Sequence, residues 1–446
     1  MRIAVIGAGI AGLGCAYALQ QRLNAAGRRD VRVSLLEAGD HFGGHANTVE
    51  LAFDTPRGRI SHGVDTGFLV FNERTYPNLI GLFEALAVPT VSTEMSFAVS
   101  LPHVGPDGLE WAGSSLATLF AQKRNLVRPA FLRMVRDILR FNALTTALAL
   151  QGEEATLGES VGAFLARHRF SEAFRDWYLL PMTGCIWSCP TEQMLAFPIG
   201  TLIRFCHNHG LLQVNNRPRW FTVRGGSREY VRRLVATLPD ARLQAVHGVR
   251  RTDSGYELLT ASGVEVFDEV VFACHSDQAL ALLEAPPPAQ AAVLGAIRYQ
   301  PNRAVLHSDP ALLPRRRAVW SAWNYSAASG EAGSTDRVCV HYLINKLQPL
   351  PEAWGDRPVV VSLNPVVPPR DELVHGTFDY AHPVFDAAAI DAQRRLATFQ
   401  GEAGAWFCGA WTGYGFHEDG LKSGLGVAEA LSARLLGEAP VARQAA

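Results

Sequence analysis

The sequence has 446 residues, of which 48% are hydrophobic and 19% charged, and its formal net charge is −1. This composition is typical of a folded chain long enough for two domains, and it excludes a disordered protein. A net charge near zero creates no overall field that attracts nucleic acid, so we expect no nucleic-acid partner. The seven cysteines are scattered, which favours reduced thiols in a cytoplasmic protein.

The first forty residues predict a strand, a glycine-rich turn, a helix and a second strand. Arg2–Ile6 is a short β-branched run, and it leads into Gly7–Gly12 with the sequence GAGIAG. A small-residue helix follows to about Leu23, and the strand Val31–Leu36 ends on Glu37. This is G-x-G-x-x-G between a strand and a helix with an acid at the tip of the next strand, which predicts a dinucleotide site.

Each residue type in this stretch has a physical role. The glycines allow a tight turn, close approach of a pyrophosphate, and close packing of helix on strand, while the helix N-terminus offers free N–H groups. The acid can accept both hydroxyls of a ribose. The candidate cofactor-binding residues here are Gly7, Gly9, Ile10, Ala11, Gly12, Glu37 and Ala38.

Two other interpretations of the N-terminal stretch remain open. It could be a tightly packed β-α-β turn without a ligand. It could also be a secretory signal, because an uncharged run from Ile3 to Gln21 follows Arg2. The phosphate-loop glycines and the acid that ends the next strand favour the dinucleotide site.

A glycine pair follows the second strand. Gly43 and Gly44 lie a few residues after Glu37 and are followed by His45. An acid that ends the second strand and then a Gly-Gly pair resembles the FAD-containing amine oxidase, phytoene desaturase and protoporphyrinogen oxidase superfamily. That family usually has Arg, near the pyrophosphate, where this chain has His45. The resemblance implies that FAD is the cofactor and that Gly43, Gly44 and His45 approach it.

Four later segments resemble the same superfamily in the same order. Val64–Phe68 is similar to the acid-x-Gly stretch before the flavin face, which implies that Gly67 and Phe68 are cofactor-binding. Trp220–Ser227 resembles the Gly-Gly-Ser helix start of monoamine oxidases. The next strand, Ala245–Arg250, is where that family clamps the adenine with backbone groups, so Val249 is a candidate. Val270–Ala273 is predicted as a further buried strand.

The last segment of the resemblance lies near the C-terminus. Trp406–Ala410 is predicted as a strand that ends in glycine, and Thr412–Gly426 resembles the C-terminal flavin motif, in which a helix N-terminus points at the flavin. The positive end of that helix would stabilise charge on reduced flavin. The candidate cofactor-binding residues of this segment are Gly409, Asp419, Gly420 and Leu421.

The region between these segments predicts a substrate domain. Phe97–Leu101 alternates like a strand, residues 116–210 are mainly helical in pattern, and Pro181–Pro190 is predicted as a loop that lines a substrate pocket or packs. A zinc site would need Cys185, Cys189, Cys206, His207 and His209. Their spacing fits no common zinc pattern, so we expect no metal.

Three arginines lie at helical spacing in residues 123–150. Arg133, Arg136 and Arg140 share one face, and apolar residues take another. This predicts either a solvated basic face or an amphipathic helix on anionic lipid, and therefore allows peripheral membrane association.

The resemblance implies an α/β fold with a Rossmann-like, GR2-type FAD-binding domain. It also implies a discontinuous α+β substrate domain that contains an antiparallel sheet and a helical insertion. The FAD-binding domain is predicted over residues 1–85, 216–284 and 401–446, the last of which includes a C-terminal helix. The substrate domain is predicted over 86–215, which carries the helical insertion, and over 285–400, which carries the sheet.

A narrower resemblance concerns the substrate. Residues 64–79 (VDTGFLVFNERTYPNL), 95–100 (MSFAVS) and 205–212 (FCHNHGLL) look like a bacterial FAD-dependent group that is similar to the oxidase-like domain of plant cyclopropane fatty acid synthases. This resemblance implies a fatty-acyl substrate that is unsaturated or carries a methyl or cyclopropane group.

Two alternatives to a fatty-acyl oxidoreductase remain open. One is a flavin amine oxidase, in which Phe416 or Tyr414 would flank the flavin, and the other is a flavin-free binding protein of the same fold. The candidate catalytic residues are His417, Phe416 and Lys422. The sequence predicts a small-molecule or lipid substrate and leaves the oligomeric state open.

Overall fold

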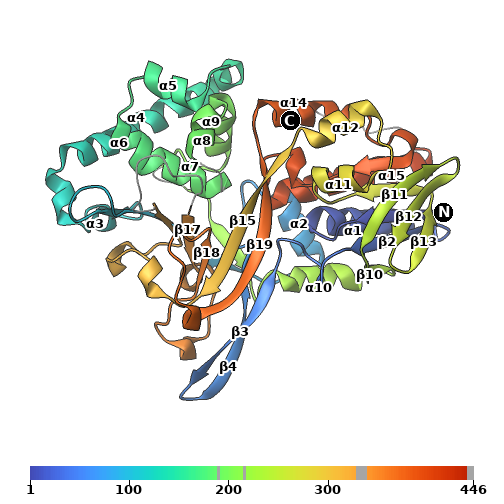
Figure 1. The fold of residues 1–446 in the computed structure, drawn as a ribbon, viewed down its shortest axis with the longest axis horizontal. Coiled ribbons are helices and arrows are strands. Elements are labelled where there is room, and N and C mark those ends of the chain that lie inside the picture. Colours follow the sequence, from blue (N-terminus) through green and yellow to red (C-terminus); the bar gives the residue numbers. More distant parts are fainter. Residues whose placement is uncertain (188–190, 214–216, 328–338, 439–446) are drawn as a thin grey trace.

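The structure is a computed structural model that describes residues 1–187, 191–213, 217–327 and 339–438. Figure 1 shows a Rossmann-like part on the right, two long strands through the middle, and a lobe of helices at the upper left. Within the described ranges, no helix combines the length and the apolarity that are needed to cross a bilayer.

The Rossmann-like part is built on a five-stranded parallel sheet. Its strands are, in order, β10 (Ala241–Leu243), β2 (Arg32–Glu37), β1 (Arg2–Ile6), β14 (Glu269–Phe272) and β20 (Ala405–Phe407). The central strands are almost continuously apolar because helices or a second sheet cover both faces.

The two faces of this sheet have different covers. One face packs against α1 (Ile10–Ala25), α10 (Arg228–Ala236) and α15 (His417–Leu436). The other face packs against a small antiparallel sheet and against α11 (Ser276–Leu282), α12 (Pro288–Gly295) and α14 (Ala387–Arg395). The strands of the small sheet are β11 (Val246–Thr252), β12 (Gly255–Thr260) and β13 (Gly263–Phe267).

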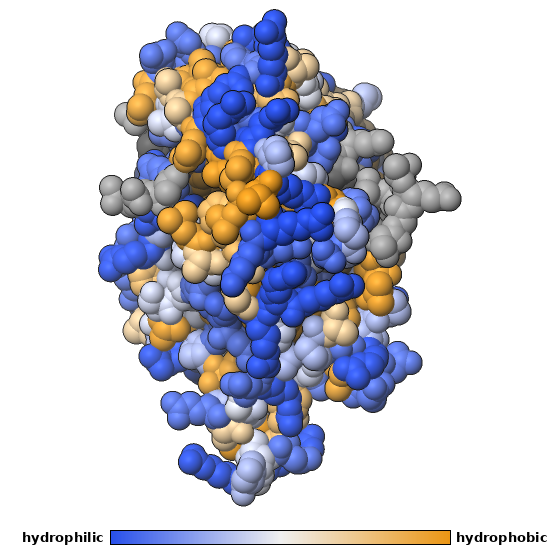
Figure 2. All heavy atoms as spheres, turned by 90° about the vertical axis from the view of Figure 1, so that its left-hand side faces the viewer, coloured by the Kyte–Doolittle hydropathy of each residue, from blue (hydrophilic) through white to orange (hydrophobic). Residues whose placement is uncertain are grey.

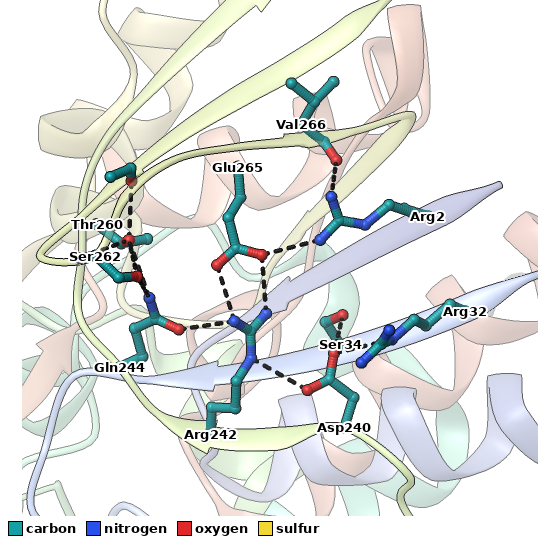
Figure 3. Close-up of polar contacts among 11 residues, drawn as sticks. Arg2, Arg32, Ser34, Asp240, Arg242, Gln244, Thr260, Ser262, Glu265 and Val266 are labelled. Atoms are coloured by element: carbon teal, nitrogen blue, oxygen red, sulfur yellow. Dashed lines mark hydrogen bonds and ion pairs between the residues drawn. The ribbon is translucent and has the colours of Figure 1, made fainter.

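A polar network fastens the small sheet to the edge of the parallel sheet (Figure 3). Arg242 on β10 lies 2.8 Å from Glu265 and 3.1 Å from Asp240, and Glu265 also binds Arg2 of β1. The Arg242 guanidinium lowers the pKa of Glu265, so this carboxylate stays charged. Gln244 hydrogen-bonds to the same network, which fixes the start of β11 beside the end of β2.

The substrate part contains a seven-stranded sheet. Its order is β19 (Val374–Val384), β15 (Arg298–His307), β18 (Val360–Leu363), β17 (Cys339–Leu343), β16 (Trp323–Ser326), β7 (Phe97–Leu101) and β8 (Leu109–Ala112). Neighbouring strands are antiparallel except β16 and β7, which are parallel. The mixed α/β fold with antiparallel sheets confirms the predicted fold class.

Shorter elements connect the two parts. They are β3 (Thr48–Thr55), β4 (Gly58–Asp65), β5 (Phe71–Asn72), α2 (Pro77–Ala85), β6 (Thr90–Thr93), β9 (Trp220–Val223) and α13 (Ile344–Leu347). Strands β5, β9 and β6 form a small antiparallel sheet, so the segment that leaves the Rossmann-like part and the segment that returns to it lie side by side.

The helical lobe contains α3 (Leu116–Leu119), α4 (Pro129–Gln151), α5 (Val161–Arg167), α6 (Glu172–Phe174), α7 (Leu180–Trp187), α8 (Thr191–Ala196) and α9 (Ile199–Asn208). The prediction of a loop over Pro181–Pro190 is wrong for its first part, because α7 continues to Trp187. A π-helical turn, Arg175–Leu179, precedes α7. Its widened hydrogen bonding accommodates Pro181, which has no N–H to donate. Residues 188–190 lie outside the described residues.

The strands of the parallel sheet come from all three segments predicted for the FAD-binding domain, and the seven-stranded sheet comes from the other two. Helices α12 and α14 fall within residues 285–400, which are predicted as substrate domain, yet they pack on the parallel sheet. The departure predicted at Pro286–Pro288 therefore comes later along the chain, at β15.

A buried carboxylate joins the two parts. Asp65, at the end of β4, accepts hydrogen bonds from Thr48 Oγ1 (2.6 Å), from Ser227 N (2.9 Å) and Oγ (2.7 Å), and from Gln348 Nε2 (2.8 Å). Ser227 begins α10 of the Rossmann-like part, and Gln348 follows α13 of the substrate part. Burial raises the pKa of Asp65 to about 6, so these donors hold an ionised group at neutral pH.

We expect the Asp65→Ala substitution to lower the free energy of unfolding by about 3–5 kcal/mol, because it leaves several buried donors without an acceptor. Denaturant unfolding of the purified protein measures this loss. The matched control is Asp54→Ala, in the exposed hairpin between β3 and β4, which should change stability by less than about 1 kcal/mol. Equal effects of the two substitutions would contradict the role of Asp65.

Candidate functional site

A cavity of about 820 Å³ lies where the two parts of the molecule meet. One end is formed by the turns after β1 and β2, at Gly7 and Glu37, and the other by side chains of the helical lobe and the seven-stranded sheet. The carboxyl ends of parallel strands are the usual place for a ligand in such a sheet.

At the turn after β1, backbone segments pack very close to one another. Gly7 has φ +102°, and a Cβ there would lie 2.9 Å from the carbonyl oxygen of Ala273 on the neighbouring strand. A Cβ on Gly12 would overlap the Gly7 carbonyl. At Gly9, by contrast, nothing lies within 4 Å of the position that a Cβ would take, so a ligand can approach its backbone from the cavity.

The N-terminus of α1 faces the same space. The helix begins at Ile10 after Gly9, no side chain caps it, and its first turn carries no acid. Ile10 and Ala11 line the cavity. A 16-residue helix with free N–H groups and an unneutralised positive end fits the pyrophosphate of a dinucleotide.

Glu37 lies at the edge of the cavity next to Ala38. Its Oε2 accepts a hydrogen bond from Ala8 N (2.6 Å), and its Oε1 accepts one from Gly39 N (2.8 Å). Each carboxylate oxygen has a further lone pair, which can accept a ribose hydroxyl. The side chain therefore orders the glycine turn and presents an acceptor to the cavity.

The glycine pair lies across from Gly9. Gly43 N donates to Ala8 O at 2.8 Å, and a Cβ on Gly44 would lie 3.2 Å from the Gly9 Cα. The carbonyl of His45 then accepts a hydrogen bond from Phe68 N at 2.7 Å and touches Gly67. The three predicted segments around Gly9, Gly44 and Gly67 are thus brought together along one wall of the cavity.

The His45 side chain is buried among other rings. It stacks on Tyr380 with centroids 4.8 Å apart and lies 5.3 Å from His382. Burial lowers the pKa of His45 and lowers that of His382 to about 4, so both imidazoles are neutral at pH 7. His45 Nε2 is buried and has no hydrogen-bond partner among the described residues. His45 therefore offers a neutral polar atom to a ligand, where an arginine would offer a cation.

The start of α15 differs from the prediction. The helix begins at His417, so Asp419–Leu421 lie inside the first turn and the cavity is lined by Tyr414–His417. Asp419 Oδ2 accepts from Phe416 N (2.9 Å), a Cβ on Gly420 would lie 2.9 Å from Ile10, and Leu421 is fully buried against α1. Asp419 therefore caps α15, Gly420 and Leu421 pack it against α1, and none of the three lines the cavity.

His417 is placed at the cavity wall. Its ring stacks on Phe68 with centroids 3.9 Å apart, and its Nε2 lies 2.6 Å from Tyr230 Oη. Burial lowers the pKa of His417 to about 3, so its imidazole stays neutral and acts by packing and hydrogen bonding. Lys422, in contrast, is exposed on the outside of α15, which removes it from the catalytic candidates.

Val249 also lies away from the cavity. It pairs with Leu258 inside the small sheet, and its carbonyl accepts a hydrogen bond from Glu284 N at 3.1 Å. The wall at this end is formed by Gln244, Val246 and His247. Val249, the residue predicted from this strand, is therefore not part of the cavity wall, whereas Val246 and His247 of the same strand are. Gly409, two residues after β20, lines the cavity.

The far end of the cavity is an aromatic chamber. Phe416 stacks on Phe205 at 5.1 Å, and Trp187 and His209 lie 4.6 Å and 3.9 Å from the same ring. Burial lowers the pKa of His209 to about 4, so it is uncharged. The chamber is further lined by Met95, Cys185, Ile186, Leu211, Trp220, Trp323, Tyr342, Phe385 and Tyr414. Cys185, Ile186 and Trp187 belong to the segment Pro181–Pro190, which the sequence predicts to line a substrate pocket or to pack. The sequence considers Cys185 and His209 only as zinc ligands, and it assigns no substrate contact to most of the other lining residues, which come from distant segments.

The cavity contains no activated thiol in its described lining. Burial raises the pKa of Cys274 to about 12 and also raises the pKa of Cys185 well above its ordinary value, so both are protonated. Among the described residues, no three His, Cys, Asp or Glu side chains are placed to hold a metal ion. Cys189, part of the zinc hypothesis, lies outside the described residues.

The neutral state of His417 makes stability depend on pH. Because its folded pKa is about 3, below the ordinary 6.5, only the unfolded chain takes up a proton at pH 5. Stability is therefore lost as pH falls below 6.5, by about 2 kcal/mol between pH 7 and 5 for this one residue. Denaturant unfolding at both pH values measures this effect. Between pH 7 and 5, the His417→Asn variant should lose about 2 kcal/mol less stability than the unaltered protein. Equal losses in both proteins would contradict the burial of a neutral imidazole.

Comparisons with known proteins agree with this geometry. A family model described as an NAD(P)-binding Rossmann-like domain matches residues 5–86. No curated protein sequence matches the chain. Many solved structures match the chain, among them three that match over nearly its full length. Cyclohexylamine oxidase from Brevibacterium oxydans has a TM-score of 0.68 at 14% identity, covering 98% of this chain and 99% of that chain.

The names of the other two solved structures refer to different substrates. A CLA-producing fatty acid isomerase from P. acnes has a TM-score of 0.64 at 15% identity, covering 95% of this chain and 97% of that chain. Wild-type putrescine oxidase bound to putrescine has a TM-score of 0.61 at 15% identity, covering 98% and 100%. At these identities the comparisons show the fold. The chain therefore shares the fold of these solved structures, and its residues 5–86 match a Rossmann-like domain.

Proposed function

We propose that the protein is an FAD-dependent oxidoreductase that takes a hydride from a fatty-acyl chain, one that is unsaturated or carries a methyl or cyclopropane group. The observation that carries this proposal is the continuity of the cavity, which runs from the glycine turn of the Rossmann-like part into the aromatic chamber. A dinucleotide on the turn and an apolar substrate in the chamber would meet inside one enclosure.

The length of the cavity beyond the glycine turn favours FAD over a nicotinamide dinucleotide. The family model that matches residues 5–86 is described by NAD(P), and a Rossmann-like turn suits either cofactor. The cavity continues past that turn along Gly67–Phe68 and the start of α15, as the resemblance to FAD enzymes implies. Glu37 disfavours a 2′-phosphate, because two negative groups would meet there.

The chain's own residues would bind and orient the cofactor. When bound, FAD accepts the hydride. The free N–H groups of α1 would hold its phosphates, Glu37 would accept ribose hydroxyls, and Gly9 and Gly44 leave room for close approach. Buried neutral rings such as His417 and His45 would keep water and charge away from the reacting atoms.

The chamber favours an acyl chain over an amine. Among the described residues that line the whole cavity, Glu37 is the only acid, and it lies at the opposite end from the chamber. An ammonium group would therefore find no carboxylate beside the aromatic rings, whereas an alkyl chain would bury its surface against them. The amine oxidase alternative rests on Tyr414 and Phe416, which are both at the wall as flanking aromatics would be.

An absorption spectrum followed by anaerobic titration tests the proposal. Bound FAD gives bands near roughly 370 and 450 nm. We expect detergent-dispersed unsaturated or cyclopropane acyl lipids to bleach the upper band and cyclohexylamine or putrescine to leave it unchanged. Bleaching by amines alone would favour the amine oxidase, and a colourless protein that does not take up added FAD would favour a flavin-free binding protein.

We expect Glu37→Ala to weaken FAD binding by about 1–3 kcal/mol through lost charge-assisted hydrogen bonds. Equilibrium dialysis of the apoprotein with FAD measures the change. Glu84→Ala, on the exposed side of α2, is the matched control and should bind FAD like the unaltered protein. Unchanged affinity in the Glu37 variant would remove this acid from the site.

A further inference from the structure

The outer surface of the helical lobe exposes an unusual number of large apolar side chains. Figure 2 looks onto this lobe and shows hydrophobic residues gathered beside a run of hydrophilic ones in its upper half. The exposed apolar residues of α3, α4 and the short helix between them are Leu116 (75% exposed), Leu126 (53%), Val127 (77%), Leu132 (43%), Leu139 (55%) and Leu150 (73%). We call these six residues the outer apolar row.

The helix geometry aligns part of this row. Leu132, Leu139 and Leu150 are separated by seven and eleven residues, which are about two and three turns of α4. They therefore lie in a line on one side of the helix. The opposite side of α4, with Phe131, Met134 and Phe141, is already buried in the core. Helix α4 thus has two apolar sides, and the fold uses only one of them.

The charged residues around the outer apolar row are mostly basic. Residues 116–150 contain six basic residues, Lys123, Arg124, Arg128, Arg133, Arg136 and Arg140, and a single acid, Asp137. Asp137 is buried, and Arg136 and Arg140 lie 3.7 Å and 3.5 Å from it. The exposed acids of neighbouring elements are Asp107, which pairs with Arg124 at 2.9 Å, Glu153 directly after α4, and Glu172 on α6. The surface therefore carries a local positive charge on a protein whose net charge is −1.

The individual cations differ in how free they are. Arg140 donates to the carbonyl of His168 and stacks on Phe170, so it is part of the fold. Lys123 and Arg133 are exposed, and within the described residues neither forms an ion pair. These two can meet an external anion without breaking an internal contact.

We infer that this surface docks on an anionic lipid bilayer, with the outer apolar row in the interface and the basic residues at the headgroups. Apolar side chains flanked by unpaired cations match such a surface, which supplies both hydrocarbon and negative charge. A second copy of this chain would bring like charges together. The inference about docking stands by itself, whereas its link to substrate rests on the proposed function.

The buried side of α4 connects the surface to the chamber. It packs with α7 and α9, which supply Cys185, Trp187 and Phe205 to the cavity wall. A bilayer against the outer side would therefore lie on the chamber side of the molecule, and the substrate class would be acyl chains of membrane lipids.

Flotation of the purified protein with vesicles tests the inference. We expect flotation with vesicles of phosphatidylcholine mixed with phosphatidylglycerol, and little with phosphatidylcholine alone. Added salt should weaken it, because the electrostatic part is screened. Lys123→Glu with Arg133→Glu should lower the partition coefficient at least about 30-fold, from about 1 kcal/mol per basic residue. Leu132→Ser with Leu139→Ser should lower it at least about tenfold.

Matched variants at exposed positions outside the helical lobe serve as controls. Leu259→Ser with Val264→Ser removes equally exposed apolar residues of the small sheet, and Arg29→Glu with Arg57→Glu reverses two exposed arginines. Both control proteins should float like the unaltered protein. Failure of the unaltered protein to float, or equal losses in test and control variants, would overturn the inference. So would a dimer that the Leu132 and Leu139 substitutions dissociate without any vesicle binding.

The flavin titration separates this result from the proposed function. The docking surface is supported and the acyl substrate is contradicted if the unaltered protein floats, both test variants lose flotation, and acyl lipids do not bleach the flavin. The acyl substrate is supported and the docking surface is contradicted if detergent-dispersed lipids bleach the flavin but the protein never floats.

Discussion

The buried carboxylate of Asp65 is the constraint on which the arrangement of the two parts depends. It holds the start of α10, the start of β3 and the residue after α13, and the backbone then passes directly to Gly67 and Phe68 at the cavity. A charged group in this position is tolerated because four donors satisfy it. Glu418 acts in a similar way nearby, since it accepts hydrogen bonds from Asn78 N and Leu79 N and so fixes α15 to the first turn of α2.

In contrast to these two buried carboxyl groups, the lining of the cavity is almost neutral. Its buried histidines His45, His209, His382 and His417 are uncharged, its thiols are protonated, and its far wall is aromatic. Such an enclosure suits chemistry in which a bound cofactor, and not a side chain, takes the electrons. The protein's contribution would then be to place two molecules against each other and to exclude water.

Local sequence singles out the segments that form the glycine-rich end of this cavity. The glycine turn, Glu37 and the pair Gly43–Gly44 belong to short segments whose backbone geometry is dictated by the residue types themselves. The chamber could not be predicted in this way, because Met95, Phe205 and Trp323 meet only through the sheet and helix packing of the complete fold. The sequence pattern places the start of α15 a few residues late, because Asp419 and Gly420 match a ligand-facing pattern and instead serve helix capping and packing on α1.

The order of strands in the parallel sheet has a consequence for biosynthesis. Strand β1 is synthesised before the other strands of its sheet, which is completed by β20, and α1 packs on α15, which ends at Leu436. The glycine turn therefore leaves the ribosome nearly the whole chain length before Gly409 and His417 can close the opposite wall. Nascent chains must carry an unfinished sheet edge and an uncovered face of α1 through most of translation, which makes assembly of this domain a late event that depends on contacts between the two ends of the chain.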